Sequence, residues 1–99
     1  MAKYVLSYRV PADYTPNDEA HAEWAAWFDE LGSALVDPGN AVTEYGSLGE
    51  VGGSGSRVAG YSLVSAEDMD SALALAKGCP ALQVGGGVEI GPVMETAEA

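Results

Sequence analysis

The last third of the chain constrains the fold most, because it contains three elements in a fixed order. Residues 57–64, RVAGYSLV, are rich in β-branched and aromatic side chains and predict a strand. Residues 65–68, SAED, have the form of a capping box, and residues 67–77 carry apolar side chains at helical spacing. Gly78 ends this helix, and residues 88–94 predict a closing strand. A sheet with at least one helix packed on it follows from this order.

The first half predicts a similar unit. Residues 3–10, KYVLSYRV, contain no helix or strand breaker and predict a strand. Thr15 and Pro16 predict the start of a helix, with Thr15 as its cap, and the helix continues to about Leu35. His21 falls at the edge of the apolar face of this helix. That face consists of Ala20, Trp24, Trp27, Phe28, Leu31 and Leu35.

A turn and a weaker strand lie between these two units. Residues 37–40, DPGN, have turn chemistry, residues 41–48 predict a strand, and residues 49–56 form a Gly/Ser-rich loop. The order β-α-β-β-α-β over 99 residues favours one domain, 1–99, of the α+β class. It predicts a ferredoxin-like fold, in which two helices cover one face of a four-stranded antiparallel sheet.

The second face of this sheet carries apolar side chains that a monomer leaves uncovered. These are Val5, Tyr45, Tyr61, Leu63 and Val93. Burial of this surface against a second copy predicts a twofold homodimer.

Charge and hydropathy exclude several classes of partner. Fifteen acidic residues against four basic ones give a net charge of −11, and the basic residues are scattered. We therefore expect neither nucleic acid nor a membrane surface as partner, although a basic protein docking onto the acidic exterior stays open. No apolar run approaches the ~18 residues of a membrane span, so a cytoplasmic protein is expected. The single cysteine, Cys79, is expected to be a small buried side chain.

The motifs for metal, phosphate or nucleophile-elbow chemistry do not occur, and we expect neither a metal nor a cofactor. The remaining candidate is a pair formed by His21 and Asp37, because a carboxylate beside an imidazole orients it and makes it a better base. Residue chemistry alone favours simpler roles: His21 as a half-exposed residue at the helix edge, and Asp37 as part of a DPG turn.

The closing strand, which reads VEIGPV, and the order of elements before it resemble the YCII-related family. The resemblance implies a dimeric α/β barrel with His21 and Asp37 in a cleft between the first helix and the sheet. It further implies a cofactor-free lyase or isomerase acting on a small cyclic or aromatic metabolite. The implied cleft walls are Ser7, Tyr8, Trp24 and Tyr61.

The chain departs from that family at two places. The DGPF segment of many relatives is replaced by the Gly/Ser loop, and Gly91 stands where the family's E-x-R-P run has an arginine. A non-catalytic protein that binds a small ligand, or a dimeric accessory protein, is therefore the alternative function.

Overall fold

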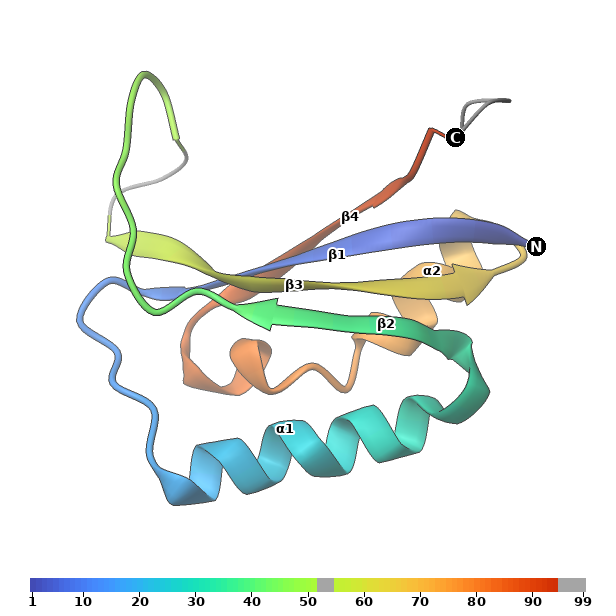
Figure 1. The fold of residues 1–99 in the computed structure, drawn as a ribbon, viewed down its shortest axis with the longest axis horizontal. Coiled ribbons are helices and arrows are strands. Elements are labelled where there is room, and N and C mark those ends of the chain that lie inside the picture. The colour runs from blue at the N-terminus through green and yellow to red at the C-terminus, as the bar shows by residue number, and fades with distance from the viewer. Residues whose placement is uncertain (52–54, 95–99) are drawn as a thin grey trace.

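The computed structural model describes residues 1–51 and 55–94 as an α+β fold (Figure 1). Its strands and helices are β1 (Ala2–Pro11), α1 (Asp18–Leu31), β2 (Leu35–Ala41), β3 (Ser56–Ala66), α2 (Met69–Ala76) and β4 (Gly87–Pro92). Two short 3₁₀ helices, η1 (Gly32–Ala34) and η2 (Pro80–Val84), follow α1 and α2. The predicted order of strands and helices is confirmed.

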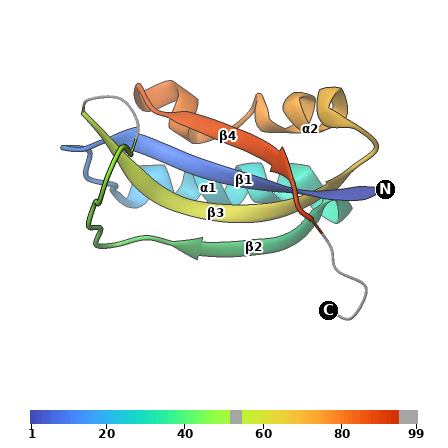
Figure 2. The ribbon, with the colours of Figure 1, turned by 90° about the horizontal axis from the view of Figure 1, so that it is seen from above.

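The four strands form one antiparallel sheet in the order β2-β3-β1-β4. The central pairing joins β1 to β3 from Ala2 opposite Ala66 to Pro11 opposite Ser56, with one irregularity beside Tyr8. Both helices lie on the same side of the sheet (Figures 1 and 2). The architecture is consistent with the predicted ferredoxin-like fold.

The core lies between this sheet and the two helices. Alternate residues of β1 point toward the helices and are buried, whereas Val5, Ser7 and Arg9 face the other side and are partly exposed. Leu6 is completely buried, and removal of a leucine side chain from water contributes about 1.5–3 kcal/mol. The buried cluster also contains Trp27, Leu31, Val64, Ala66, Ala72, Ala76 and Cys79. The expected burial of Cys79 is thus confirmed.

Helix α1 begins later and ends earlier than predicted. Asn17 caps it, with Oδ1 accepting a 2.8 Å hydrogen bond from Ala20 N, so the assignment of the cap to Thr15 was wrong. Asparagine caps a helix at least as well as threonine, which makes the two sites hard to distinguish by sequence. At the other end, Gly32 adopts φ 55° and its N–H bonds to Phe28 O, which ends the helix before Leu35.

Strand β2 occupies residues 35–41 instead of the predicted 41–48. The DPGN turn lies inside this edge strand as a local irregularity, where Asp37 Oδ1 accepts a 2.8 Å hydrogen bond from Gly39 N. Gly39 has φ 69°, and a Cβ there would lie 1.9 Å from Tyr61 O. Pro38 is tolerated because an edge strand leaves some N–H positions unpaired. The turn chemistry was therefore identified, but its place in the sheet was not.

Helix α2 is capped by Asp68 instead of by the predicted box starting at Ser65, which belongs to β3. Asp68 Oδ1 accepts a 2.8 Å hydrogen bond from Ser71 N, and this bond lowers the pKa of the Asp68 carboxyl group. Gly78, which follows α2, passes so close to Trp27 that a Cβ would lie 2.9 Å from the indole ring. The predicted loop 49–56 lies partly, and the tail 95–99 wholly, outside the described residues.

The longest helix in the part of the chain that the structure describes is α1, with 14 residues. None of the helices in residues 1–51 and 55–94 combines the length and the apolar character needed to cross a bilayer.

Candidate ligand cavity

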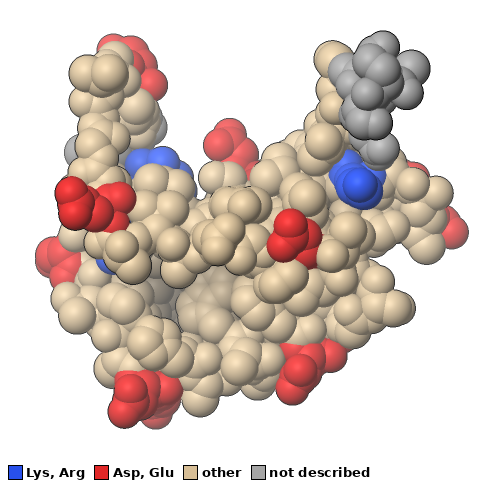
Figure 3. All heavy atoms as spheres, in the orientation of Figure 1, with Lys and Arg blue, Asp and Glu red and all other residues tan. Residues whose placement is uncertain are grey.

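A cavity of about 550 Å³ lies between α1 and the sheet, next to the edge strand β2. In the space-filling view it is a hollow with acidic side chains on the surface around it (Figure 3). Helix α1 supplies His21, Trp24, Ala25 and Phe28, and the sheet supplies Tyr8, Val10, Arg57, Ala59 and Gly60. The segment from Pro38 to Thr43, together with Tyr14 and Pro16, closes the remaining sides.

Aromatic rings make the helix wall of the cavity rigid. Tyr8 and Trp24 meet edge to face with ring centroids 4.7 Å apart, and Trp24 contacts Phe28 at 6.0 Å. Trp27 lies behind them and packs against Tyr8, Trp24 and Phe28 at centroid distances of 5.6–6.0 Å. Each such edge-to-face pair contributes about 0.5–1.5 kcal/mol beyond area burial, so this wall is preformed for a flat apolar ligand.

The hydroxyl group of Tyr8 is the most unusual polar group in this wall. Tyr8 is 4% exposed, and among the described residues its hydroxyl is buried without any hydrogen-bond partner. Ser62 lies nearby on β3 but donates its own hydrogen to Pro38 O at 2.8 Å. A buried hydroxyl left unpaired costs about 1–3 kcal/mol.

Burial also controls the ionisation of this phenol. Desolvation raises the pKa of Tyr8 well above its usual 10.0. The neighbouring Ser62 hydroxyl opposes part of this rise, and the Cys79 thiol adds to it. Tyr8 is therefore a neutral hydrogen-bond donor throughout the physiological pH range.

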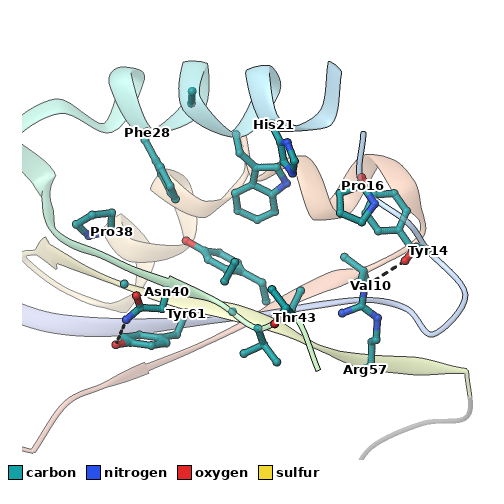
Figure 4. Close-up of a pocket in the computed structure, with 18 residues that line it drawn as sticks. Val10, Tyr14, Pro16, His21, Phe28, Pro38, Asn40, Thr43, Arg57 and Tyr61 are labelled. Atoms are coloured by element: carbon teal, nitrogen blue, oxygen red, sulfur yellow. Dashed lines mark hydrogen bonds between the residues drawn. The ribbon is translucent and has the colours of Figure 1, made fainter. Parts of the chain in front are cut away.

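Polar side chains gather on the opposite wall and at the opening of the cavity. The His21 side chain projects from α1, and the Arg57 side chain projects from β3 toward it (Figure 4). Arg57 donates a 3.1 Å hydrogen bond to Tyr14 O. Asn40 on β2 donates from Nδ2 to the Tyr61 hydroxyl at 3.1 Å. The cavity therefore combines a flat apolar wall with a few hydrogen-bonding and cationic groups.

Four of the six residues singled out from the sequence line this cavity: Tyr8, His21, Trp24 and Tyr61. The Tyr61 ring, however, lies on the side of the strands away from α1, where it is 40% exposed (Figure 4). Ser7 does not line the cavity, because it alternates with Tyr8 along β1 and faces the opposite side of the sheet.

The structure does not bring His21 and Asp37 together. His21 is exposed at the cavity opening, whereas Asp37 is exposed on β2 and its carboxylate accepts the bond from Gly39 N. Among the described residues no hydrogen bond joins the two side chains. Asp37 therefore occupies the simpler of its two predicted roles, as a turn former.

Arg57 is a cavity-lining residue that sequence reasoning missed. Strict alternation along β3 from Gly60 would place Val58 on the helix side and Arg57 on the outer side. A bulge at Ala59 shifts the register, so that Arg57 pairs with Val10 and shares its face. Gly60 at this bulge has φ 153° and permits the close approach of Asn40 O, which gives a weak sequence signal for the irregularity.

Within residues 1–51 and 55–94, no three His, Cys, Asp or Glu side chains lie together as ligands of a metal ion would. Comparison with known proteins finds no family model and no curated protein that matches the chain.

Replacement of Tyr8 by phenylalanine is expected to stabilise the protein. Tyr8→Phe removes the buried unpaired hydroxyl, so the free energy of unfolding in urea should rise by about 1 kcal/mol. Tyr4→Phe is the matched control, since Tyr4 is equally buried on the same face of β1 but does not line the cavity. A loss of more than about 1 kcal/mol in Tyr8→Phe would mean that the hydroxyl has a partner.

The stability of Tyr8→Phe should also depend on pH differently from that of the wild type. The folded protein retains the Tyr8 proton that the unfolded chain releases above pH ~10, because the folded pKa is the higher one. The stability of the wild type should therefore fall relative to Tyr8→Phe as the pH rises above about 10. Unfolding measured at about pH 8 and pH 11 tests this, and an equal slope for both proteins would contradict it.

Proposed function

We propose that this protein binds a small, largely apolar or aromatic molecule in the cavity between α1 and the sheet. The observation that carries the proposal is the cavity of about 550 Å³ itself, whose helix side is lined by the aromatic rings of Trp24 and Phe28. Binding sites for small molecules have this composition: mostly hydrophobic and aromatic surface with a few placed polar groups. The ligand stacks against Trp24 and Phe28.

The size of the cavity supports a ligand of one or two rings. Its volume of about 550 Å³ lies within the ~300–1,000 Å³ of typical ligand sites. An apolar cavity of about 150 Å³ is already sufficient for benzene. A bicyclic aromatic molecule with one or two polar substituents therefore fits without displacing α1.

A cofactor-free lyase or isomerase is the second candidate, favoured by the position of His21 at the same cavity. In this proposal His21 moves a proton on the bound molecule and Asp37 orients the imidazole. Asp37 would have to release Gly39 N and turn toward His21. Ligand binding needs no such rearrangement, and it is therefore the first candidate.

We further propose that the chain belongs to the YCII-related family and forms a dimeric α/β barrel in the cytoplasm. The antiparallel order β2-β3-β1-β4 supports this, as does the partly exposed outer face of the sheet, with Val5, Tyr61 and Leu63. A stable dimer buries roughly 800 Å² on each partner. The apolar side chains on the outer face of the sheet can contribute to that buried area.

Aromatic ligands should quench the tryptophan fluorescence, because Trp24 forms part of the wall. We expect saturable quenching by bicyclic aromatic carbonyl compounds, charged or neutral. If no member of the series saturates the signal, the proposed binding function is wrong.

The catalytic candidate predicts a separate result for His21. Once a substrate is identified, His21→Asn should lower kcat by at least about 100-fold while the fold and ligand affinity are retained. Asp37→Asn should show a smaller loss. Equal turnover by His21→Asn and the wild type would eliminate the catalytic candidate without affecting the binding function.

The dimer proposal is tested by mass in solution. Sedimentation equilibrium at about 50 μM should give twice the chain mass for the wild type, and Leu63→Glu should reduce it to the monomer mass. Leu73→Glu, on the exposed side of α2, is the control that should remain dimeric. A monomeric wild type contradicts the proposal.

A further inference from the structure

The ionisable side chains of the cavity are distributed in an unexpected way. The chain has 15 acidic residues, yet none of the described residues that line the cavity is an aspartate or a glutamate. Apart from tyrosines, the ionisable groups that line it are His21 and Arg57, and both can carry positive charge. In a protein of net charge −11, a cavity whose only fixed charge is positive points to an anionic ligand.

The guanidinium group of Arg57 has the hydrogen-bonding capacity that such a ligand needs. It is partly buried and donates to two neutral acceptors, Tyr14 O at 3.1 Å and, weakly, Val58 O at 3.5 Å. An arginine has five N–H donors, so subtraction of these two leaves three. Among the described residues no carboxylate pairs with it, and its charge is uncompensated inside the site.

The position of Arg57 sets the orientation of a bound molecule. Arg57 lies at the end of the cavity formed by Tyr14 and Pro16, whereas Phe28 and Pro38 lie at the other end (Figure 4). A ligand with an anionic group at one end and a ring at the other can therefore place its anionic group at Arg57 and its ring at the Phe28 end of the cavity.

From these observations we infer that the natural ligand is an aromatic or cyclic monocarboxylate whose carboxylate binds Arg57 and whose ring packs on the Trp24 wall. The inference rests on the proposed binding function and names its ligand class. Guanidinium and carboxylate form paired N–H···O bonds with matched geometry, which makes this contact stronger than a neutral hydrogen bond.

The charge of the protein as a whole argues for one carboxylate and against a multiply charged group. At physiological salt the Debye length is about 8 Å, so the repulsion between a bound anion and distant acidic side chains is screened. The attraction between the anion and the partly buried Arg57 is screened much less. A dianion such as a phosphate monoester would bring a second negative charge into a protein of net charge −11, where Arg57 is the single fixed positive charge among the described residues that line the cavity. An aromatic cation, by contrast, would suit the rings by cation–π contact but would be repelled by Arg57.

Three probes with the same ring separate these cases: naphthoate, naphthamide and naphthylmethylammonium, titrated into the intact protein by calorimetry. We expect naphthoate to bind the wild type at least about tenfold more tightly than naphthamide, and the ammonium compound to bind most weakly. Arg57→Gln should bring the naphthoate and naphthamide affinities within about twofold. Arg57→Lys, which keeps the charge but lacks the paired geometry, should fall between the two.

Arg9→Gln is the matched control. Arg9 is the other arginine of the chain, is also partly buried and donates to Ser56 Oγ, Ser56 O and Val51 O, but it does not line the cavity. This variant should retain the full preference for naphthoate. Circular dichroism establishes that each variant is folded, and the comparison of the three probes on the wild type needs no variant at all.

The possible outcomes separate this inference from the function on which it rests. If naphthamide binds as tightly as naphthoate, or if the preference survives Arg57→Gln, the cavity binds ligands but the carboxylate assignment is overturned. If the ammonium compound binds best, the ligand class is a cation and the inference is equally overturned. If none of the probes binds, the binding function itself fails.

Discussion

The pairing of β1 with β3 is the interaction on which the rest of the structure depends. It extends over the whole length of β1, and it places the alternating apolar residues of that strand opposite Ser62, Val64 and Ala66 on one face. Both helices pack on the face so formed. The one irregularity in this pairing, at Ala59, is also the feature that brings Arg57 into the cavity.

Tyr8 belongs both to the buried core and to the lining of the cavity. Its ring belongs to the buried core, where it packs on Trp24 and Trp27, but its hydroxyl has no partner among the described residues. A phenylalanine would satisfy the packing equally well and avoid the cost of the buried hydroxyl.

The balance of charges on the surface differs from the balance of charges in the cavity. Over the surface, acidic side chains outnumber basic ones. Within the cavity the balance is inverted, because Arg57 is partly buried and the acidic groups lie outside. Short-range pairing in a region of low dielectric outweighs screened repulsion from distant charges, so a net charge of −11 is compatible with an anionic ligand.

The sequence by itself determined the order of elements and the apolar face of α1, because these depend on local propensity and on the helical period of 3.6 residues. The resemblance to the YCII-related family further implied a cleft with Tyr8, Trp24 and His21 around it, and all three line the cavity. Only the tertiary structure decided the place of β2, where a turn-forming segment became part of an edge strand. It likewise separated Asp37 from His21 and brought Arg57 to the inner face. These outcomes depend on strand register, which long-range pairing sets and which one inserted residue reverses.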